Sequence, residues 1–226
     1  MNVTLAGRAF LPSATPASVA GIMKIDLKKD RKDLYAPSAR DFSEVVVPPI
    51  TYLAIDGHGD PNTAQEYVDA VSALYAAGYA VKFGLRARTG DDFVVGPLEG
   101  LWSSDDPASF AERRKDAWEW TMLIPLPDQV ADDDIRAGVE KATANKPALP
   151  LDRVSARRLD EGLSLQIMHI GSYDDETPTL ARLHHVVMPE RGYTWNGPHH
   201  EIYLGDPRRI APERLRTVLR QPVRPA

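Results

Sequence analysis

The chain has 226 residues, a formal net charge of −5 and no cysteine. Without cysteine, disulfides, thiolate nucleophiles and cysteine-ligated metal sites are excluded. Direct nucleic acid binding is not expected either, because it needs a basic face and no Lys/Arg run alternates with aromatic residues here. No stretch approaches the apolar length of a membrane span, and these features together fit a cytoplasmic location.

Residues 1–22 are rich in Ala, Ser and Pro and poor in charge. Pro12 and Pro16 interrupt any apolar core that a secretory signal peptide would need. We therefore expect a disordered segment or an extension there, followed by one domain over residues 23–226.

Hydrophobic periodicity, caps and turn residues predict an α+β fold, with antiparallel sheets and helices packed on one side. Asn62 is a candidate helix cap, and Thr177 followed by Pro178 begins another helix. In chain order we expect a strand at 51–56, a helix from Asn62, a hairpin of 81–88 and 93–101, a short helix from Pro107, a strand at 117–124, a linker helix at about 132–146, a hairpin of 154–159 and 163–170, a helix from Thr177, a strand at 199–204 and a C-terminal helix at about 211–220.

An internal repeat relates residues 53–79 to residues 167–193. Each segment reads as a strand, a Gly/Asp-rich turn, a helix and then Gly-Tyr. Three pairs lie 114 positions apart, namely Gly57 and Gly171, Asp60 and Asp174, and Tyr79 and Tyr193. We predict two strand-helix-strand-strand modules, repeat one at about 50–127 and repeat two at about 152–207, with a ligand groove on the pseudo-twofold axis between them.

Two strand segments carry the candidate chemistry, AWEWTMLIPLP (117–127) and HHEIYLGDP (199–207). Glu119 and Glu201 lie 82 positions apart, as do Pro125 and Pro207, so these strands could be equivalent in the two halves. The two-residue period of a strand puts Glu201 and Tyr203 on one face. A carboxylate among aromatic rings has a raised pKa and can act as a base, or it stays charged and holds a cation. The alternative for Glu201 is a solvent-facing strand residue.

Large aromatic residues near strand ends or on helix faces are either core residues or the walls of a ligand pocket. A cation over such a ring gains roughly 0.5–2 kcal/mol. The candidates are Trp102, Trp118, Trp120, Trp195, Tyr75, Tyr173 and Tyr203.

Metal binding is not expected. His199 and His200 on a strand point to opposite faces, and His184 and His185 on a helix diverge by about a hundred degrees. No His or carboxylate spacing has ligand geometry. We expect neither a metal nor a cofactor.

The chain resembles the stand-alone branch of the GyrI-like small-molecule-binding family over residues 24–223. The resemblance rests on DGHGDPNT (56–63), LYAAGYAVKF (74–83), PLEGLW (97–102), WEWTMLIPLPD (118–128), LQIMHIGSYDDETPT (165–179) and HHEIYLGDPRRIAPERLRTVLRQPV (199–223). It implies the two-module fold with ligands between the modules. It also implies roles for Glu201 and Tyr203 as catalytic residues, and for Glu99, Trp102, Trp118 and Trp120 as pocket walls.

The resemblance leaves three functions open. Some stand-alone members resemble hydrolases that open cyclopropane-bearing DNA-alkylating compounds, a detoxification activity in which Glu201 would activate water and Tyr203 would orient the substrate or donate a proton. The second is a binding or sensor module for an aromatic or cationic small molecule, acting with a separate transcription regulator. The third, binding to gyrase, has only the family name and the acidic charge behind it and is not expected.

Overall fold

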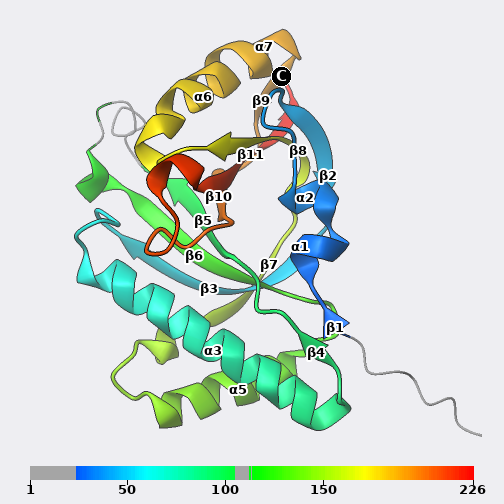
Figure 1. The fold of residues 1–226 in the computed structure, drawn as a ribbon, viewed down its shortest axis with the longest axis vertical. Coiled ribbons are helices and arrows are strands. Elements are labelled where there is room, and N and C mark those ends of the chain that lie inside the picture. Colours follow the sequence, from blue (N-terminus) through cyan, green and yellow to red (C-terminus); the bar gives the residue numbers. More distant parts are fainter. Residues whose placement is uncertain (1–23, 105–111, 113) are drawn as a thin grey trace, which may run out of the picture.

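The structure, a computed structural model, describes residues 24–104, 112 and 114–226. The extension expected at 1–22 and the helix expected from Pro107 lie outside the described residues. A nine-stranded antiparallel sheet dominates the fold, in the order β2-β8-β11-β10-β5-β6-β3-β7 with β9 paired to β11 (Figure 1). Its strands are β2 (Ser43–Val47), β3 (Ile50–His58), β5 (Leu98–Ser103), β6 (Glu119–Leu126), β7 (Ser155–Leu159), β8 (Gly162–Ile170), β9 (Tyr193–Trp195), β10 (His199–Tyr203) and β11 (Arg216–Pro225). Short β1 (Lys24–Ile25) and β4 (Asp92–Phe93) form a separate parallel pair.

The sheet curls until its two ends meet. Only Pro48 and Pro49 separate β2 from β3, and only Asp160 and Glu161 separate β7 from β8. Val47 pairs with Gly162, and Ile50 pairs with Leu159. The segments β2–β3 and β7–β8 therefore run side by side around the bend, each as one long bent strand. The curl has an inner face, lined near its opening by α1 (Leu27–Asp30) and α2 (Lys32–Tyr35), and an outer face.

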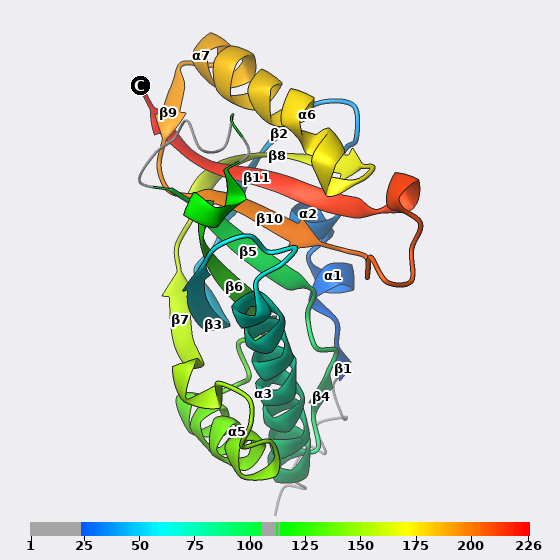
Figure 2. The same ribbon diagram turned by 90° about the vertical axis from the view of Figure 1, so that its left-hand side faces the viewer.

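The longer helices cover the outer face in two groups (Figure 2). The first contains α3 (Gln65–Thr89) and α5 (Asp132–Asn145), and α3 packs on β3 and β6. The second contains α6 (Thr177–Arg182), a π-helical turn η4 (Leu183–Val187) and α7 (Met188–Glu190), which pack on β8 and β11. Strands β10 and β5 lie between the two groups.

The predicted duplication is confirmed by the topology. The modules are β3-α3-β5-β6 and β8-(α6–α7)-β10-β11, and the strand order β8-β11-β10-β5-β6-β3 is symmetric about the β10–β5 pair. Strand β10 is therefore equivalent to β5, and the proposed equivalence of Glu119 and Glu201 was wrong. The second module also begins at β8 and extends through β11, past the limit of 207 given to repeat two.

The predicted strand at 81–88 is wrong, because α3 continues to Thr89 and ends at Gly90 with φ 84°. The alternating Val-Lys-Phe pattern suggested a strand. Buried Leu74, Ala77, Val81 and Leu85 instead keep the helical spacing without interruption. The helix also begins later than predicted, at Gln65, because the Asn62 side chain bonds to Asp60 and does not cap it.

The predicted C-terminal helix at 211–220 is wrong as well. Pro212 begins only a 3-10 turn (Pro212–Arg214), and the following residues form β11. The spacing of Leu215, Val218 and Leu219 looks helical, but it arises because β11 lies at the middle of the sheet and is buried on both faces.

The predicted hairpin of 154–159 and 163–170 does not form. Strand β7 pairs with β3, while β8 pairs with β2 and β11, because the chain at Asp160-Glu161 bends around the curl and does not reverse. Among the helices of the described part of the chain, none has the length and apolarity needed to cross a bilayer.

Candidate functional site

The strand glutamate Glu201 lies on the outer face of β10, between the two helix groups. The Tyr203 hydroxyl donates a hydrogen bond of 2.8 Å to Glu201 Oε2, and the Trp102 indole N–H donates one of 2.9 Å to the Tyr203 oxygen. The Glu201 side chain is 14% exposed. Its second oxygen, Oε1, is 3.7 Å from His199 Nε2, too far for a hydrogen bond.

Aromatic rings from both modules surround this carboxylate. Tyr173 contacts the Tyr203 ring edge-on at 5.4 Å between centroids, and Trp118 contacts Trp102 in the same way at 5.7 Å. Burial raises the pKa of Tyr67 on α3, and Tyr173 and Glu201 lie close enough to add to this rise. We call the group Glu201, Tyr203, Trp102, Trp118, Tyr67 and Tyr173 the Glu201 site.

Glycine makes the close approach of these side chains possible. Gly100 pairs with Glu201 across β5 and β10, on the outer face. A Cβ atom there would lie 3.1 Å from Trp102 Nε1 and 3.3 Å from the Tyr203 hydroxyl. Gly57 has the same role for Trp120, whose ring would lie 2.1 Å from an added Cβ. The packing of Trp102, Tyr203 and Trp120 on the outer face therefore requires glycine at positions 100 and 57.

A second carboxyl, Glu176, lies beside the Glu201 site and is only 4% exposed. Burial raises the pKa of Glu201 to about 7, which the Tyr203 hydrogen bond and the charges of His200 and Lys115 partly oppose. Burial also raises the pKa of Glu176 to about 9, with further repulsion from Glu201. Two neighbouring carboxyls thus titrate near or above neutral pH, and Glu201 can accept a proton there.

Glu99 does not join this site, although it was predicted as a pocket wall. It pairs with Ile202 in the register and so lies on the inner face. There Tyr35 donates to Glu99 Oε1 at 3.0 Å, and His200 Nε2 lies 3.0 Å from Glu99 Oε2. Glu99 is 0% exposed.

Three predicted aromatic residues lie at the edges of the site. Trp120 is 2% exposed and packs behind it, edge-on to Tyr67 at 5.3 Å. Trp195 on β9 contacts His184 at 4.3 Å. Tyr75 on α3 is half-buried near Leu98, where burial raises its pKa.

Several residues in or next to the Glu201 site were missed by the sequence analysis, and for some of them the sequence pattern indicated their position. His199 is two residues before Glu201, so strand alternation already puts it on the same face. Glu176 follows Tyr173 by three residues, a spacing that shares a helix face. Tyr67 and Gly100 had no such signal, because their places depend on the packing of α3 and on strand register.

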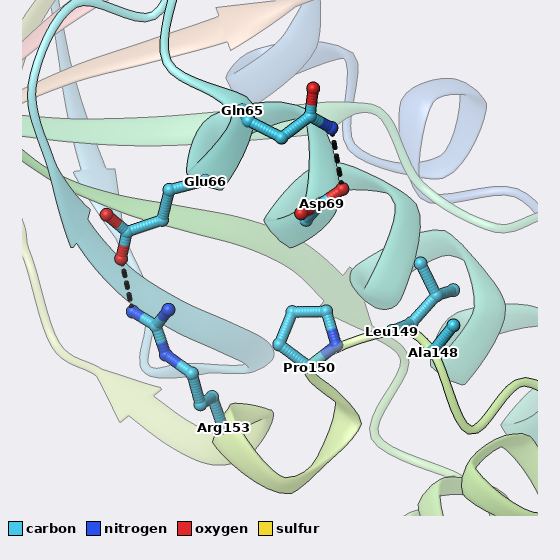
Figure 3. Close-up of a pocket in the computed structure, with 7 residues that line it drawn as sticks. All are labelled: Gln65, Glu66, Asp69, Ala148, Leu149, Pro150 and Arg153. Carbon is cyan, nitrogen blue, oxygen red and sulfur yellow. Dashed lines mark hydrogen bonds and ion pairs between the residues drawn. The ribbon is translucent and has the colours of Figure 1, made fainter.

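Two depressions on the described surface lie away from Glu201. One of about 390 Å³ is bounded by α3 and the segment before β7 (Figure 3). Its charged groups are already paired, Arg153 with Glu66 at 2.8 Å and Asp69 with Gln65 at 2.9 Å. Within the described ranges, no three His, Cys, Asp or Glu side chains are arranged to hold a metal ion.

Comparisons with known proteins identify the family and the fold. The model of the GyrI-like small molecule binding domain matches residues 40–224. A conserved protein from Listeria innocua is 39% identical with a TM-score of 0.81, covering 88% of this chain and 100% of its own. A hydrolase from Listeria innocua is 38% identical with a TM-score of 0.80, covering 89% and 100%. The C-terminal domain of EcmrR, at 10% identity and a TM-score of 0.52 over 82% and 98%, shares the fold alone. No curated protein matches the chain.

Proposed function

Because the chain belongs to the GyrI-like small-molecule-binding family, we propose that it binds a flat aromatic small molecule at the Glu201 site and hydrolyses it, with Glu201 as the base. The substrate class is a cyclopropane ring conjugated to a carbonyl, as in DNA-alkylating indole compounds. The activity would be one of detoxification. A relative of 38% identity described as a hydrolase supports this class of activity.

One observation carries the proposal, the state of the Glu201 carboxyl. Its Oε2 is held by Tyr203, its Oε1 has no hydrogen-bond partner among the described residues, and its pKa is raised to about 7. A base is most effective when its pKa is close to the working pH. The surrounding rings supply the flat walls that would hold a planar electrophile.

The reaction needs one water molecule. Glu201 Oε1 takes a proton from water while the water oxygen bonds to the cyclopropane CH₂ carbon. The C–C bond to that carbon breaks, and its electron pair passes into the conjugated carbonyl, leaving a phenolate. The phenolate then takes the proton back from Glu201, so that the product is the substrate plus one water.

Tyr203 acts in this scheme as a positioning residue. Its proton is committed to Glu201 and its oxygen accepts from Trp102. Burial and the Glu201 charge raise its pKa well above 10. Tyr203 therefore keeps Oε2 in place and leaves Oε1 free for water.

The test is mass spectrometry of a cyclopropane-bearing indole compound after incubation with the protein. Wild type should add one water, and Glu201→Gln should lower the rate by about 10²–10⁴-fold, the range for a lost general base. Glu119→Gln is the matched control, because Glu119 is an exposed strand carboxylate on β6. Equal turnover by Glu201→Gln and wild type would refute Glu201 as the base.

A second function, binding without turnover, is favoured by the combination of carboxyls and rings. Glu201 and Glu176 with Tyr67, Tyr173 and Trp102 form the kind of acidic aromatic surface that holds an organic cation. In that case a cationic dye would quench tryptophan fluorescence more strongly at pH 8 than at pH 5, because Glu201 is then charged. The compound would be recovered unchanged, and Glu201→Gln would remove the pH dependence.

A further inference from the structure

Polar side chains continue from Glu201 along the outer face into the second module. His199 precedes Glu201 by two residues on β10, and Gln221 lies on the neighbouring strand β11, next to Arg220, which pairs with His200. The Gln221 side chain is 0% exposed and His199 is 9% exposed. The equivalent strands of the first module, β5 and β6, carry the large side chains of Trp102, Trp120 and Met122 on this face and no histidine or glutamine.

The π-helical turn η4 brings a second imidazole to this place. His184 lies in η4, with its ring 6.1 Å from His199 and 4.3 Å from Trp195. π-helical turns are rare and are frequent at functional sites. Leu183 and Val187 keep η4 packed on the sheet while His184 turns toward β10.

Much of the hydrogen-bonding capacity of this group is left without a well-formed partner among the described residues. Among the described residues, no partner of adequate geometry is found for His184 Nε2, for either ring nitrogen of His199, or for Gln221 Oε1. The Gln221 amide N–H groups are already taken, by Gly197 at 2.9 Å and by Pro222 at 3.2 Å. Buried polar atoms are normally paired, and each exception calls for an explanation.

The two imidazoles are neutral. Burial, followed by repulsion from neighbouring histidines, lowers the pKa of His199 to about 3 and that of His184 to about 4. The Gln221 side chain lies close enough to both rings for a weak hydrogen-bond interaction, which partly opposes the lowering of both pKa values. A neutral imidazole both donates and accepts, while the Gln221 oxygen only accepts.

We propose that His184, His199 and Gln221 form a polar subsite for an uncharged hydroxyl or amide group at one end of the ligand, with Trp195 as its outer wall. This inference rests on the proposed binding of an aromatic molecule at the Glu201 site. A hydroxyl or amide group donates one hydrogen bond and accepts another. The neutral imidazoles of the subsite supply both the acceptor and the donor that this requires. The ligand is then asymmetric, with its apolar end on the aromatic wall of the first module and its polar end in the second.

The test compares two probes of equal size, 2-naphthol and 2-methylnaphthalene, by quenching of tryptophan fluorescence. One added hydrogen bond predicts about 3- to 10-fold tighter binding of 2-naphthol by wild type. His184→Leu and His199→Leu should each remove this preference and leave the affinity for 2-methylnaphthalene unchanged. His185→Leu is the matched control, because His185 lies on the same turn and is exposed.

The outcomes separate the two proposals. Equal affinity of wild type for both probes, or a preference that survives in both variants, overturns the subsite and leaves the aromatic site standing. Failure of both probes to bind overturns the aromatic site and the subsite with it. Histidine ring ¹⁵N spectra of wild type need no variant, and 2-naphthol should shift the resonances of His184 and His199 but not that of His185.

Discussion

His200 and Glu201 are neighbours on β10, yet their side chains lie in opposite electrostatic surroundings. On the inner face, His200 lies 2.8 Å from Glu161 and 3.0 Å from Glu99, and Arg220 lies 3.1 Å from Glu161. Although burial opposes charge, the charges and hydrogen bonds of Glu161 and Glu99 raise the pKa of His200 to about 9. On the outer face, the hydrogen bond that the described residues give Glu201 comes from the Tyr203 hydroxyl, and His199 Nε2 lies 3.7 Å from its other oxygen.

The two faces therefore treat carboxyls differently. His200 and Arg220 outweigh burial at Glu161 and lower its pKa to about 2, whereas burial raises that of Glu201 to about 7. A carboxylate with its charge fully paired holds the fold together but has no free lone pair for a substrate. A carboxyl without a cation partner costs stability and can exchange a proton near neutral pH. The inner face pairs its buried charges, and the outer face leaves Glu201 able to exchange a proton.

The largest expected effect comes from breaking the inner face. Arg220→Met leaves Glu161 buried next to a single cation and should destabilise the protein by about 3–5 kcal/mol, the usual cost of removing one partner of a buried ion pair. Urea unfolding measures it. Arg208→Met is the control, because Arg208 pairs with Asp206 at the surface, where the loss should be under about 1 kcal/mol. Equal losses would mean that the inner network is not what stabilises the curl.

A smaller effect on stability, but a large one on binding, is expected at Gly100. Gly100→Val would displace Met122 and crowd Trp102 and Tyr203, because even a Cβ lies 2.7 Å from Met122 Cε and 3.1–3.3 Å from the polar atoms of Trp102 and Tyr203. Overpacking of this kind costs about 1–3 kcal/mol, and ligand affinity should fall more steeply than stability. Gly84→Ala, a helix position with open space around its Cβ, should keep wild-type affinity in the same fluorescence titration.

The smallest effect concerns the pH dependence of stability. The pKa of Glu176 is raised from about 4.5 to about 9, so the folded state holds its proton more tightly than the unfolded state. Stability then falls as pH rises from 4.5 to 9. Glu176→Gln should flatten this fall and raise the Tm at pH 8, by about 2–4 °C for each kcal/mol of stability that protonating the buried carboxyl costs at this pH. Unchanged pH dependence would show that Glu176 is not buried beside Glu201.

The sequence predicted the parts of the site that depend on local geometry. Strand alternation places Glu201 and Tyr203 on one face and His200 on the other, as the structure has them. The repeat predicted the two modules. The first follows from the two-residue period of a single strand, and the second from the likeness of two segments of the same chain.

Features that depend on non-local pairing were not predictable. Glu99 and Trp102 are three residues apart on one strand and therefore lie on opposite faces, but which of them shares a face with Glu201 depends on the register against β10. The strand β11 reads as a helix because both of its faces are buried. The sequence repeat also does not show which module carries the polar side chains next to Glu201, because duplication preserves the strand order and not the side chains.

The most direct test of the account is a ¹³C titration of the glutamate side-chain carboxyls, with Glu201→Gln assigning the resonance. The account predicts a Glu201 resonance that titrates near pH 7 and that shifts when a flat aromatic ligand binds, while the paired Glu161 stays charged down to about pH 2. A Glu201 resonance that titrates near 4.5 and does not respond to ligand would contradict it.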